Sequence, residues 1–343
     1  MELIVLGSAG GAATANRSHP SYLLDLGGEY MMFDCGDGTL MRYQEAKLNI
    51  NKPLTIFISH LHLDHFGGLA SFIRGLGIQG RTNTIVVYHP PSLDFKDIIK
   101  THCECVKFEL KFAELHDRLS LSSNNNRFQM LVKENNHRIQ SYSFRLEEEI
   151  DRYTFDWMKA EADKIPKQYW TKIKKLGQHD GFSIPELKLM LFGSDYQIKN
   201  EYKQPRIFCY SGDTEPFEGD KELFMNATLL LHEATYINEH LSEAIKHKHS
   251  TALSATRCAI RCKAQYLLLI HRSRRYFPGY ENVHMVEATM ELGSKHATNM
   301  QYEAAQDLMK IDVKLDTKLG LFLFSTRYPD GSTHLSHGDP IRE

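Results

Sequence analysis

The stretch 59–69, Ser-His-Leu-His-Leu-Asp-His-Phe-Gly-Gly-Leu, constrains this chain more than any other, because it places three histidines and one aspartate within six residues. It follows the apolar run 54–58, whose length and β-branched residues predict a buried strand. His60 and His62 alternate with leucines, so in an extended loop their imidazoles point the same way. The aspartate and histidine that follow lie where the chain turns toward a helix. Imidazole nitrogens and carboxylate oxygens suit zinc, so we predict that this loop serves two metal ions.

Neighbouring histidines are common, but His-x-His-x-Asp-His at a strand end, followed by two glycines, is a specific combination. The pattern resembles the signature of the metallo-β-lactamase fold. That resemblance implies an α/β protein with a four-layer αββα sandwich, and it leaves the substrate open because one fold serves many reactions.

Composition and charge limit the classes of protein to which this chain can belong. A chain of 343 residues with 42% hydrophobic and 24% charged residues can bury one large core or two modest ones, and a single two-sheet α/β domain with an insertion fits. The net charge is −2, so attraction to RNA must come from local patches. Six cysteines without a framework spacing predict a reducing compartment. The first residues predict a strand rather than a signal peptide, and no run approaches the roughly 20 apolar residues of a membrane span, so we expect a cytoplasmic protein without membrane contact.

Two later strands repeat the arrangement of the first. Residues 206–210 predict a strand that ends in Ser-Gly-Asp213-Thr, and residues 266–270 predict a strand that ends at His271. Strand ends in layered α/β proteins form the rim where sites assemble. We therefore expect Asp213 and His271 to meet the histidine-rich loop.

A further strand and helix carry residues suited to phosphate chemistry. The strand predicted at 228–231 is followed by His232-Glu233-Ala234-Thr235, and His249 precedes a helix predicted over 252–263. The serine or threonine after His249 caps that helix, so His249 lies beside its positive end, a place suited to a phosphate.

Other residues allow two interpretations each. Asp34, at the end of a strand predicted at 30–34, is either a carboxylate that orients a metal-bound histidine or a simple turn residue. The glycine-rich turn 7–11 either approaches a phosphate or only turns the chain. His137, which we expect to open the half-buried strand 139–145, is by itself an ordinary surface histidine.

Two cysteine pairs are close in sequence. Cys258 and Cys262 lie one turn apart in a mostly apolar helix, where buried small side chains are expected. His102-Cys103-Glu104-Cys105 is interpreted as an incidental loop, because no second cysteine pair has the spacing that would complete a zinc site.

Taken together, these segments resemble the ribonuclease Z family, endonucleases that trim 3′ trailers from precursor tRNA. The resemblance covers nearly the whole chain. It includes the glycine-rich turn 7–11, Phe33-Asp34-Cys35-Gly36, the histidine-rich loop, His137 with residues 141–145, residues 211–214, residues 232–235, His249-Ser250-Thr251, and His271 with Ser273, Arg275 and Tyr276. The His-Glu-Ala-Thr and His-Ser-Thr elements are much more specific than the histidine-rich loop.

The resemblance implies a role for each site residue. One zinc would be held by His60, His62 and His137, the other by Asp64, His65 and His271, with Asp213 bridging. Asp64 would also accept a proton from the attacking water, and His249, held by Glu233, would protonate the departing 3′ oxygen. The products would be a tRNA with a 3′ hydroxyl and a trailer with a 5′ phosphate. Ligand softness favours two zinc ions, although carboxylate-containing sites also admit manganese.

The polar stretch 148–203 resembles the exosite arm that grips the tRNA elbow in this family, inserted into a catalytic domain of residues 1–147 and 204–343. Lysines contact phosphates without reading sequence, and aromatic rings pack on sugars or bases. The substrate contacts assigned on this basis are Arg275, Lys172, Lys174 and Lys175. Acidic residues dilute the charge of this stretch, so a solvated insertion with its own small core is the alternative. Because such arms act across a dimer, the resemblance implies a homodimer.

Leu63, Arg272 and residues 165–168 depart from the family pattern, which leaves the treatment of mature CCA ends open. The main alternative function is a general metallo-phosphodiesterase acting on small or cyclic phosphodiesters, which would not need the arm. A non-catalytic RNA-binding module is disfavoured because every expected ligand is present. A β-lactamase or thiolester hydrolase is disfavoured by the His-Glu-Ala-Thr and His-Ser-Thr elements.

Overall fold

The computed structural model describes residues 1–123, 127–150, 153–176, 180–184, 189–199, 204–217, 220–277, 279–280, 282–295, 299–316 and 320–338. The chain forms two compact units. The main unit comprises Met1–Glu148, Arg206–Asp316 and Leu321–Glu343, and the smaller one comprises Glu149–Pro205 with Thr317–Gly320. The segment Glu149–Pro205 is called the insertion below.

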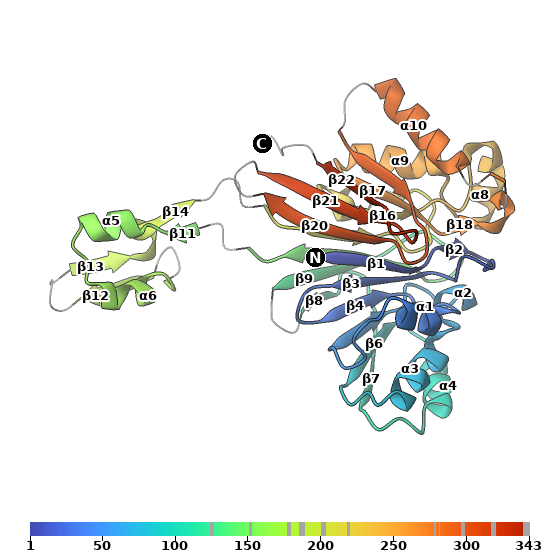
Figure 1. Cartoon of the computed structure of the whole chain (residues 1–343), viewed down its shortest axis with the longest axis horizontal. Coiled ribbons are helices and arrows are strands. Elements are labelled where there is room, and N and C mark those ends of the chain that lie inside the picture. Colours follow the sequence, from blue (N-terminus) through green and yellow to red (C-terminus); the bar gives the residue numbers. More distant parts are fainter. Residues whose placement is uncertain are drawn as a thin grey trace. The chain divides into compact units, whose positions relative to one another are not determined.

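Two mixed β-sheets form the centre of the main unit (Figure 1). In spatial order, the first sheet contains β22 (Thr333–His337), β21 (Leu321–Arg327), β20 (Lys310–Asp316), β1 (Glu2–Gly7), β3 (Ser21–Asp25), β4 (Tyr30–Phe33), β5 (Leu54–Phe57), β6 (Ile85–His89) and β7 (Leu110–Glu114). The second contains β19 (Gln301–Ala304), β17 (Tyr266–Ile270), β16 (Leu229–Glu233), β15 (Ile207–Tyr210), β10 (Tyr142–Glu148), β9 (Phe128–Glu134) and β8 (Ser120–Ser122). The short strands β2 (Ala9–Gly10) and β18 (Arg272–Ser273) pair separately.

Helices cover the outer faces of both sheets, as Figure 1 shows. On the first sheet they are α1 (Thr39–Glu45), α2 (Leu63–Phe66), α3 (Leu69–Ile78) and α4 (Phe95–His102). On the second, α9 (Ala252–Arg261) packs against β16 and β17, α7 (Asp220–Phe224) against β10, and α10 (Val283–Lys295) against α9 and β19. The short helix α8 (Leu241–His247) precedes α9 in the chain. Within the described ranges, no helix combines the length and apolar character needed to cross a membrane.

Alternation of side chains along the strands produces these layers. In β1, Leu3 and Val5 join the core between the two sheets, together with Phe144 of the opposite sheet. Ile4 and Leu6 of the same strand join the core beneath the helices of the first sheet. A third apolar cluster lies between the second sheet and α9. The predicted four-layer αββα sandwich is therefore confirmed.

Parallel strands bring the predicted site segments to one rim. β15, β16 and β17 are parallel neighbours in the second sheet, and β4, β5 and β6 are parallel neighbours in the first. Such strands are buried on both faces and therefore have continuous apolar sequences, as in Leu229–Leu231.

Several predicted element boundaries were wrong, and two of them bear on the site. β16 continues through His232 and Glu233, because both residues still pair with β17. His137 does not open a strand, since β10 begins only at Tyr142. The N–H of Asn135 donates to the carbonyl of Ser141 at 3.0 Å, which closes a loop and keeps His137 out of the sheet.

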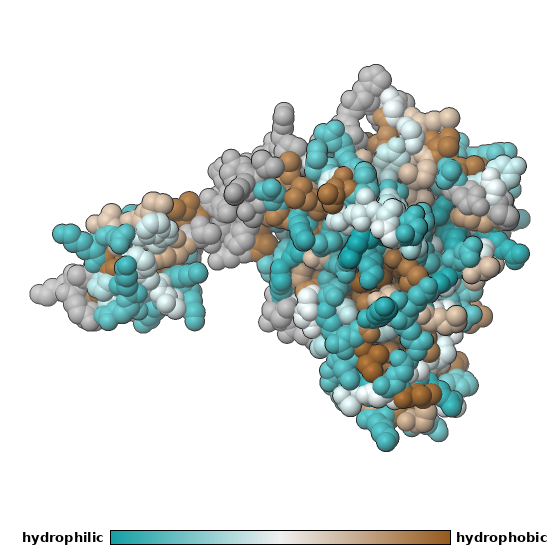
Figure 2. Space-filling model, viewed as in Figure 1, coloured by the Kyte–Doolittle hydropathy of each residue, from teal (hydrophilic) through white to brown (hydrophobic). Residues whose placement is uncertain are grey.

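The insertion has its own small core. Its described elements are β11 (Tyr153–Phe155), α5 (Trp157–Ala162), α6 (Trp170–Ile173), β12 (Gly181–Ile184), β13 (Leu189–Phe192) and β14 (Gln197–Lys199). Buried residues from several of these elements, including Ala160, Ile173 and Leu191, pack together. On the visible face of the insertion, hydrophilic and hydrophobic residues are interspersed (Figure 2).

Ion pairs join the two chain segments of the main unit that flank the insertion, one ending at Glu148 and the other beginning at Arg206. The Glu148 carboxylate accepts hydrogen bonds from Arg206 at 2.6 and 2.7 Å and from Arg127 at 2.8 and 3.1 Å. The Glu148 N–H also donates to the Arg206 carbonyl at 3.0 Å. Burial alone would raise the pKa of Glu148, but the two guanidinium groups lower it to about 2.

This lowered pKa predicts that Glu148→Gln destabilises the protein in a pH-dependent way. Glu148 is only 9% exposed, so its ionised form contributes about 3 kcal/mol to folding at neutral pH. The contribution is complete above the unfolded-state pKa and is lost as pH falls from about 4.5 to about 2. Urea unfolding across this range measures it, with exposed Glu149→Gln as control. A difference in unfolding free energy that stays constant down to the lowest pH would contradict this account.

Candidate metal centre

The histidine-rich loop follows β5 and is fixed by close backbone packing. His62 is extended and directly precedes α2, which carries His65. A Cβ atom at Gly68 would lie 2.0 Å from the carbonyl oxygen of Gly36, so only glycine fits where α3 begins. This close packing holds the loop against the turn at Gly36, at the end of β5 where its imidazoles meet the other site residues.

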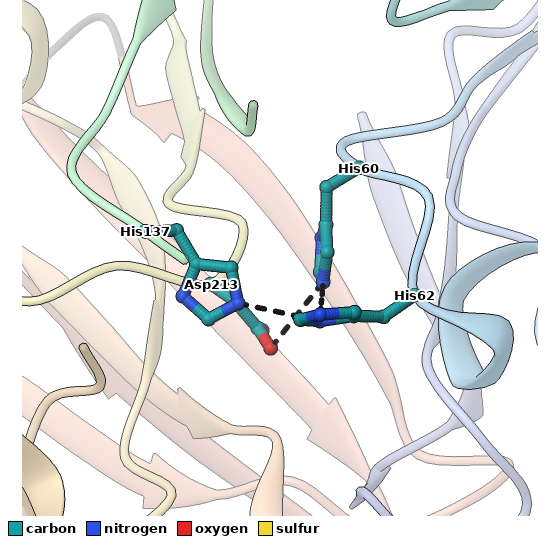
Figure 3. A group of neighbouring side chains, drawn as sticks. All are labelled: His60, His62, His137 and Asp213. Carbon is teal, nitrogen blue, oxygen red and sulfur yellow. Dashed lines mark hydrogen bonds and ion pairs between the residues drawn. The ribbon is translucent and has the colours of Figure 1, made fainter. Parts of the chain in front are cut away.

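Side chains from three separate segments converge on the first ligand cluster. The potential ligand atoms of His60, His62, His137 and Asp213 all lie within 4.8 Å of one another. His62 Nδ1 is 3.0 Å from His60 Nε2 and 3.3 Å from His137 Nε2. Figure 3 shows these side chains directed toward a common point, with Asp213 Oδ2 at 3.7 Å from His60 Nε2.

A second cluster lies beside the first. It comprises Asp64, His65 and His271, with His271 Nε2 at 3.2 Å from both His65 Nε2 and Asp64 Oδ2. Asp213 Oδ2 is also 3.4 Å from His65 Nε2 and 3.3 Å from His271 Nε2. Asp213 therefore lies between the two clusters.

Hydrogen bonds outside the clusters orient several imidazoles. The Nδ1–H of His65 donates to Asp34 at 2.7 Å, and that of His271 donates to the Thr235 hydroxyl at 2.8 Å. The Nδ1–H of His137 donates to the Lys248 carbonyl at 2.8 Å. Each bond fixes the tautomer and leaves Nε2 facing the centre. Of the two interpretations of Asp34, the structure favours a carboxylate that orients a histidine.

Both the donors and their electrostatics fit divalent cations. Asp213 Oδ1 is buried and has no hydrogen-bond partner among the described residues. Burial alone would lower the pKa of His65, but the carboxylates of Asp213 and Asp64 raise it well above its usual value. The centre thus favours added positive charge, and its nitrogen and carboxylate ligands are those preferred by zinc.

His249 lies at the edge of the centre, paired with a buried carboxylate. Its Nδ1–H donates to Glu233 Oε1 at 2.8 Å and lies 3.8 Å from Asp213 Oδ2. Glu233 is fully buried and also accepts hydrogen bonds from the N–H groups of Thr214 and Thr235. Burial alone would lower the pKa of His249, but the Glu233 carboxylate raises it to about 9.

Thr235 joins several groups of the centre, although no role of its own was predicted for it. Its hydroxyl donates to Glu233 at 2.7 Å, accepts from His271, and lies 3.2 Å from His249 Nδ1. Thr235 therefore joins the ligand clusters to the His249 pair. Its position two residues after Glu233, in the same short motif, was the available signal.

The predicted substrate contacts lie in two places. Arg275 is exposed in the main unit, with its guanidinium 5.1 Å from the ring centroid of Tyr236, which is itself 5.9 Å from that of His249. Lys172, Lys174 and Lys175 are exposed on the insertion, and the Lys172 ammonium lies 3.9 Å from the ring centroid of Phe182.

The bond between Asp34 and His65 predicts that Asp34→Asn weakens metal binding by about 10–100-fold, because a carboxylate that orients a ligand also raises its basicity. Competition with a chromophoric chelator measures the affinity. Asp37→Asn, in the same turn but exposed, is the control and should bind metal normally. Equal affinities in the two variants would show that Asp34 only shapes the turn.

Solved structures with the same fold include bacterial and human proteins. The metallo-β-lactamase fold protein YhfI from Bacillus subtilis superposes with a TM-score of 0.62 at 17% identity, covering 91% of this chain and 99% of that chain. The short form of human tRNase Z superposes with a TM-score of 0.60 at 22% identity, with the same coverage. With clusters of potential metal ligands at its strand ends, this chain has the metallo-β-lactamase fold.

Sequence comparison identifies the family within this fold. Ribonuclease Z from Pyrococcus furiosus is 30% identical over 279 residues, covering 80% of this chain and 87% of that protein. Ribonuclease Z from Methanococcus aeolicus is 28% identical over 333 residues, covering 92% of this chain and 98% of that protein. The chain belongs to the ribonuclease Z family, as the sequence motifs predicted.

A family model described as "Anti-Pycsar protein Apyc1" also matches residues 1–180, just over half of the chain, which therefore belongs to that family too. The matched range includes His60, His62 and His137 but ends before Asp213 and His249. The ribonuclease Z relatives cover most of the remaining chain as well.

Proposed function

We propose that this chain is an endoribonuclease that removes the 3′ trailer from precursor tRNA and leaves a tRNA 3′ hydroxyl and a trailer 5′ phosphate. The observation that carries the proposal is the His249–Glu233 pair, 2.8 Å apart, beside a group of metal-type ligands. Hydrolysis of a phosphodiester needs both a site for its anionic centre and an acid for its leaving oxygen. The family name of the relatives supports the choice of RNA.

The proposed ligands divide between two ions. His60, His62 and His137 would hold one, Asp64, His65 and His271 would hold the other, and Asp213 would be shared. We propose zinc as the metal, because imidazole nitrogen dominates the donors, while the carboxylates would also accept manganese. When bound, a pair of such ions stabilises the attacking and leaving oxygens of an in-line displacement.

The side chains of the centre divide the proton transfers. Asp64 accepts the proton of the attacking water, and the Gly11 N–H, 2.9 Å from Asp64 Oδ2, helps to hold this carboxylate in place. His249 donates its proton to the departing 3′ oxygen. Because Glu233 binds Nδ1 of His249, Nε2 is left to face the substrate. The raised pKa of His249 keeps this acid protonated at neutral pH.

Binding of the tRNA is assigned to the insertion, through Lys172, Lys174 and Lys175, and to Arg275 beside the centre. We propose a cytoplasmic homodimer in which the insertion of one subunit holds the tRNA that its partner cuts. Gel filtration at micromolar concentration is expected to give the mass of two protomers. A single-protomer mass would contradict the dimer and leave the cleavage reaction untouched.

Single-turnover cleavage of a 3′-extended precursor tRNA by the metal-loaded protein tests the proposed reaction. We expect one cut, directly after the discriminator base, and no cut with Asp64→Ala. A protein that holds its metals but leaves the precursor intact would refute the proposal. Hydrolysis of small or cyclic phosphodiesters would then be measured.

A further inference from the structure

Another group of potential metal ligands lies inside the main unit, and it shares no residue with the strand-end centre. Asp220 begins α7, and Cys258 and Cys262 lie one turn apart at the end of α9. One ligand atom from each of the three lies within 4.8 Å of the others. The side chains are buried, with exposures of 4%, 3% and 0%, and both cysteines belong to the apolar cluster beneath the second sheet.

With both thiols ionised, the net charge of this group together with Arg261 would be −2, which one divalent cation neutralises. Asp220 forms an ion pair with Arg261, so their charges already cancel. Two thiolates would add two negative charges, which a divalent cation neutralises. Buried charge is tolerated only when it is compensated in this way.

The geometry also supplies an additional oxygen. The Cys262 thiol donates a hydrogen bond to the main-chain carbonyl oxygen of Asp220 at 3.8 Å, which places this oxygen beside one of the two sulfurs. The two sulfurs and the carboxylate supply three of the four donors of a closed structural site, and this carbonyl would supply the fourth. Thiolate sulfur is a soft ligand that selects zinc over magnesium or calcium.

We propose that Asp220, Cys258 and Cys262 form a thiolate site for a soft divalent cation such as Zn²⁺, separate from the strand-end centre. The cation would join α7 to α9. Both cysteines pack in the same apolar cluster as Cys209 of β15 and Leu230 of β16, the strands that lead to Asp213 and Glu233. The site would therefore support the scaffold of the centre rather than contact its substrate.

Cadmium titration of the reduced protein tests this site by a readout independent of activity. Cadmium bound to thiolate gives an ultraviolet charge-transfer band that nitrogen and oxygen ligands do not give. We expect a band whose final intensity corresponds to one thiolate-bound Cd²⁺ per chain and which disappears when excess Zn²⁺ is added. The variant Cys258→Ala/Cys262→Ala is expected to lose the band.

The matched control is Cys103→Ala/Cys105→Ala, which removes the other sequence-adjacent cysteine pair, one buried and one exposed. It is expected to keep the band. No band in the unaltered protein, or a band that survives in Cys258→Ala/Cys262→Ala, would overturn the proposal. If that variant does not unfold cooperatively, Cys262→Ser takes its place. It should bind Cd²⁺ at least about tenfold more weakly, and unchanged affinity would overturn the proposal equally.

Discussion

Replacing His249 with alanine is expected to slow single-turnover cleavage of precursor tRNA by about 10²–10⁴-fold while the metals stay bound. His249 lies beside the ligand clusters, with its Nδ1 hydrogen-bonded to Glu233 and 3.8 Å from Asp213 Oδ2. His249 also forms a group of potential ligands with Asp213 and His271, but its bond to Glu233 leads us to propose that it supplies a proton rather than a metal ligand. Metal content by atomic absorption, measured alongside the rate, separates the two roles. Loss of metal in His249→Ala would make His249 a ligand instead.

The pH profile distinguishes a general acid from a residue that only shapes the site. Glu233 raises the pKa of His249, so Glu233→Gln lowers it. A general acid must be protonated to act, and the alkaline fall in rate should therefore move to lower pH in Glu233→Gln. In His249→Ala that titration should be absent. An alkaline limb unchanged in both variants would mean that another group provides the proton.

The sequence could predict those parts of the centre whose geometry is local. His60 and His62 alternate after a strand, and this spacing alone directs both imidazoles to one side. To predict the location of Asp213 and His271, one further rule was needed, namely that parallel strands end at the same rim. β15 and β17, which precede these residues, are both parallel to β16. Their role as ligands stays a prediction, although they lie within hydrogen-bonding range of the loop residues.

What the sequence did not reveal depends on contacts between distant segments. His137 reaches the centre from a loop closed by Asn135 and Ser141, and periodicity cannot detect such a closure. The two interpretations of Asp34 could be separated only after folding placed His65 and Tyr210 against it. Cys258 and Cys262 were predicted to be buried, and they are, but the carboxylate beside them comes from α7.

Deletion of residues 150–203 is expected to abolish cleavage of precursor tRNA while hydrolysis of a small aryl phosphodiester continues. The backbone bond between Glu148 and Arg206 holds the two chain ends together, so a short Gly-Ser link can replace the insertion. The insertion packs around its own core, and the cores between and outside the two sheets contain none of its residues among those described. Loss of both activities would make the insertion structural.

Contact between the insertion and tRNA can also be tested by substitution, with the insertion left in place. Lys172, Lys174 and Lys175 are exposed, and large apolar residues such as Trp157 and Phe192 are exposed on the same insertion. Phosphate contacts by these lysines predict that the triple alanine variant binds tRNA more weakly and with a shallower salt dependence, by roughly 1 in the logarithmic slope per lost contact.

The matched control replaces three exposed lysines of the main unit, Lys96, Lys100 and Lys107. It removes the same charge from the chain, so a general loss of electrostatic attraction would affect both variants equally. Contact through the insertion instead predicts that only the first variant changes the salt slope, whereas its rate on the small aryl phosphodiester stays normal. Equal slopes in the two variants would mean that the insertion does not hold the tRNA.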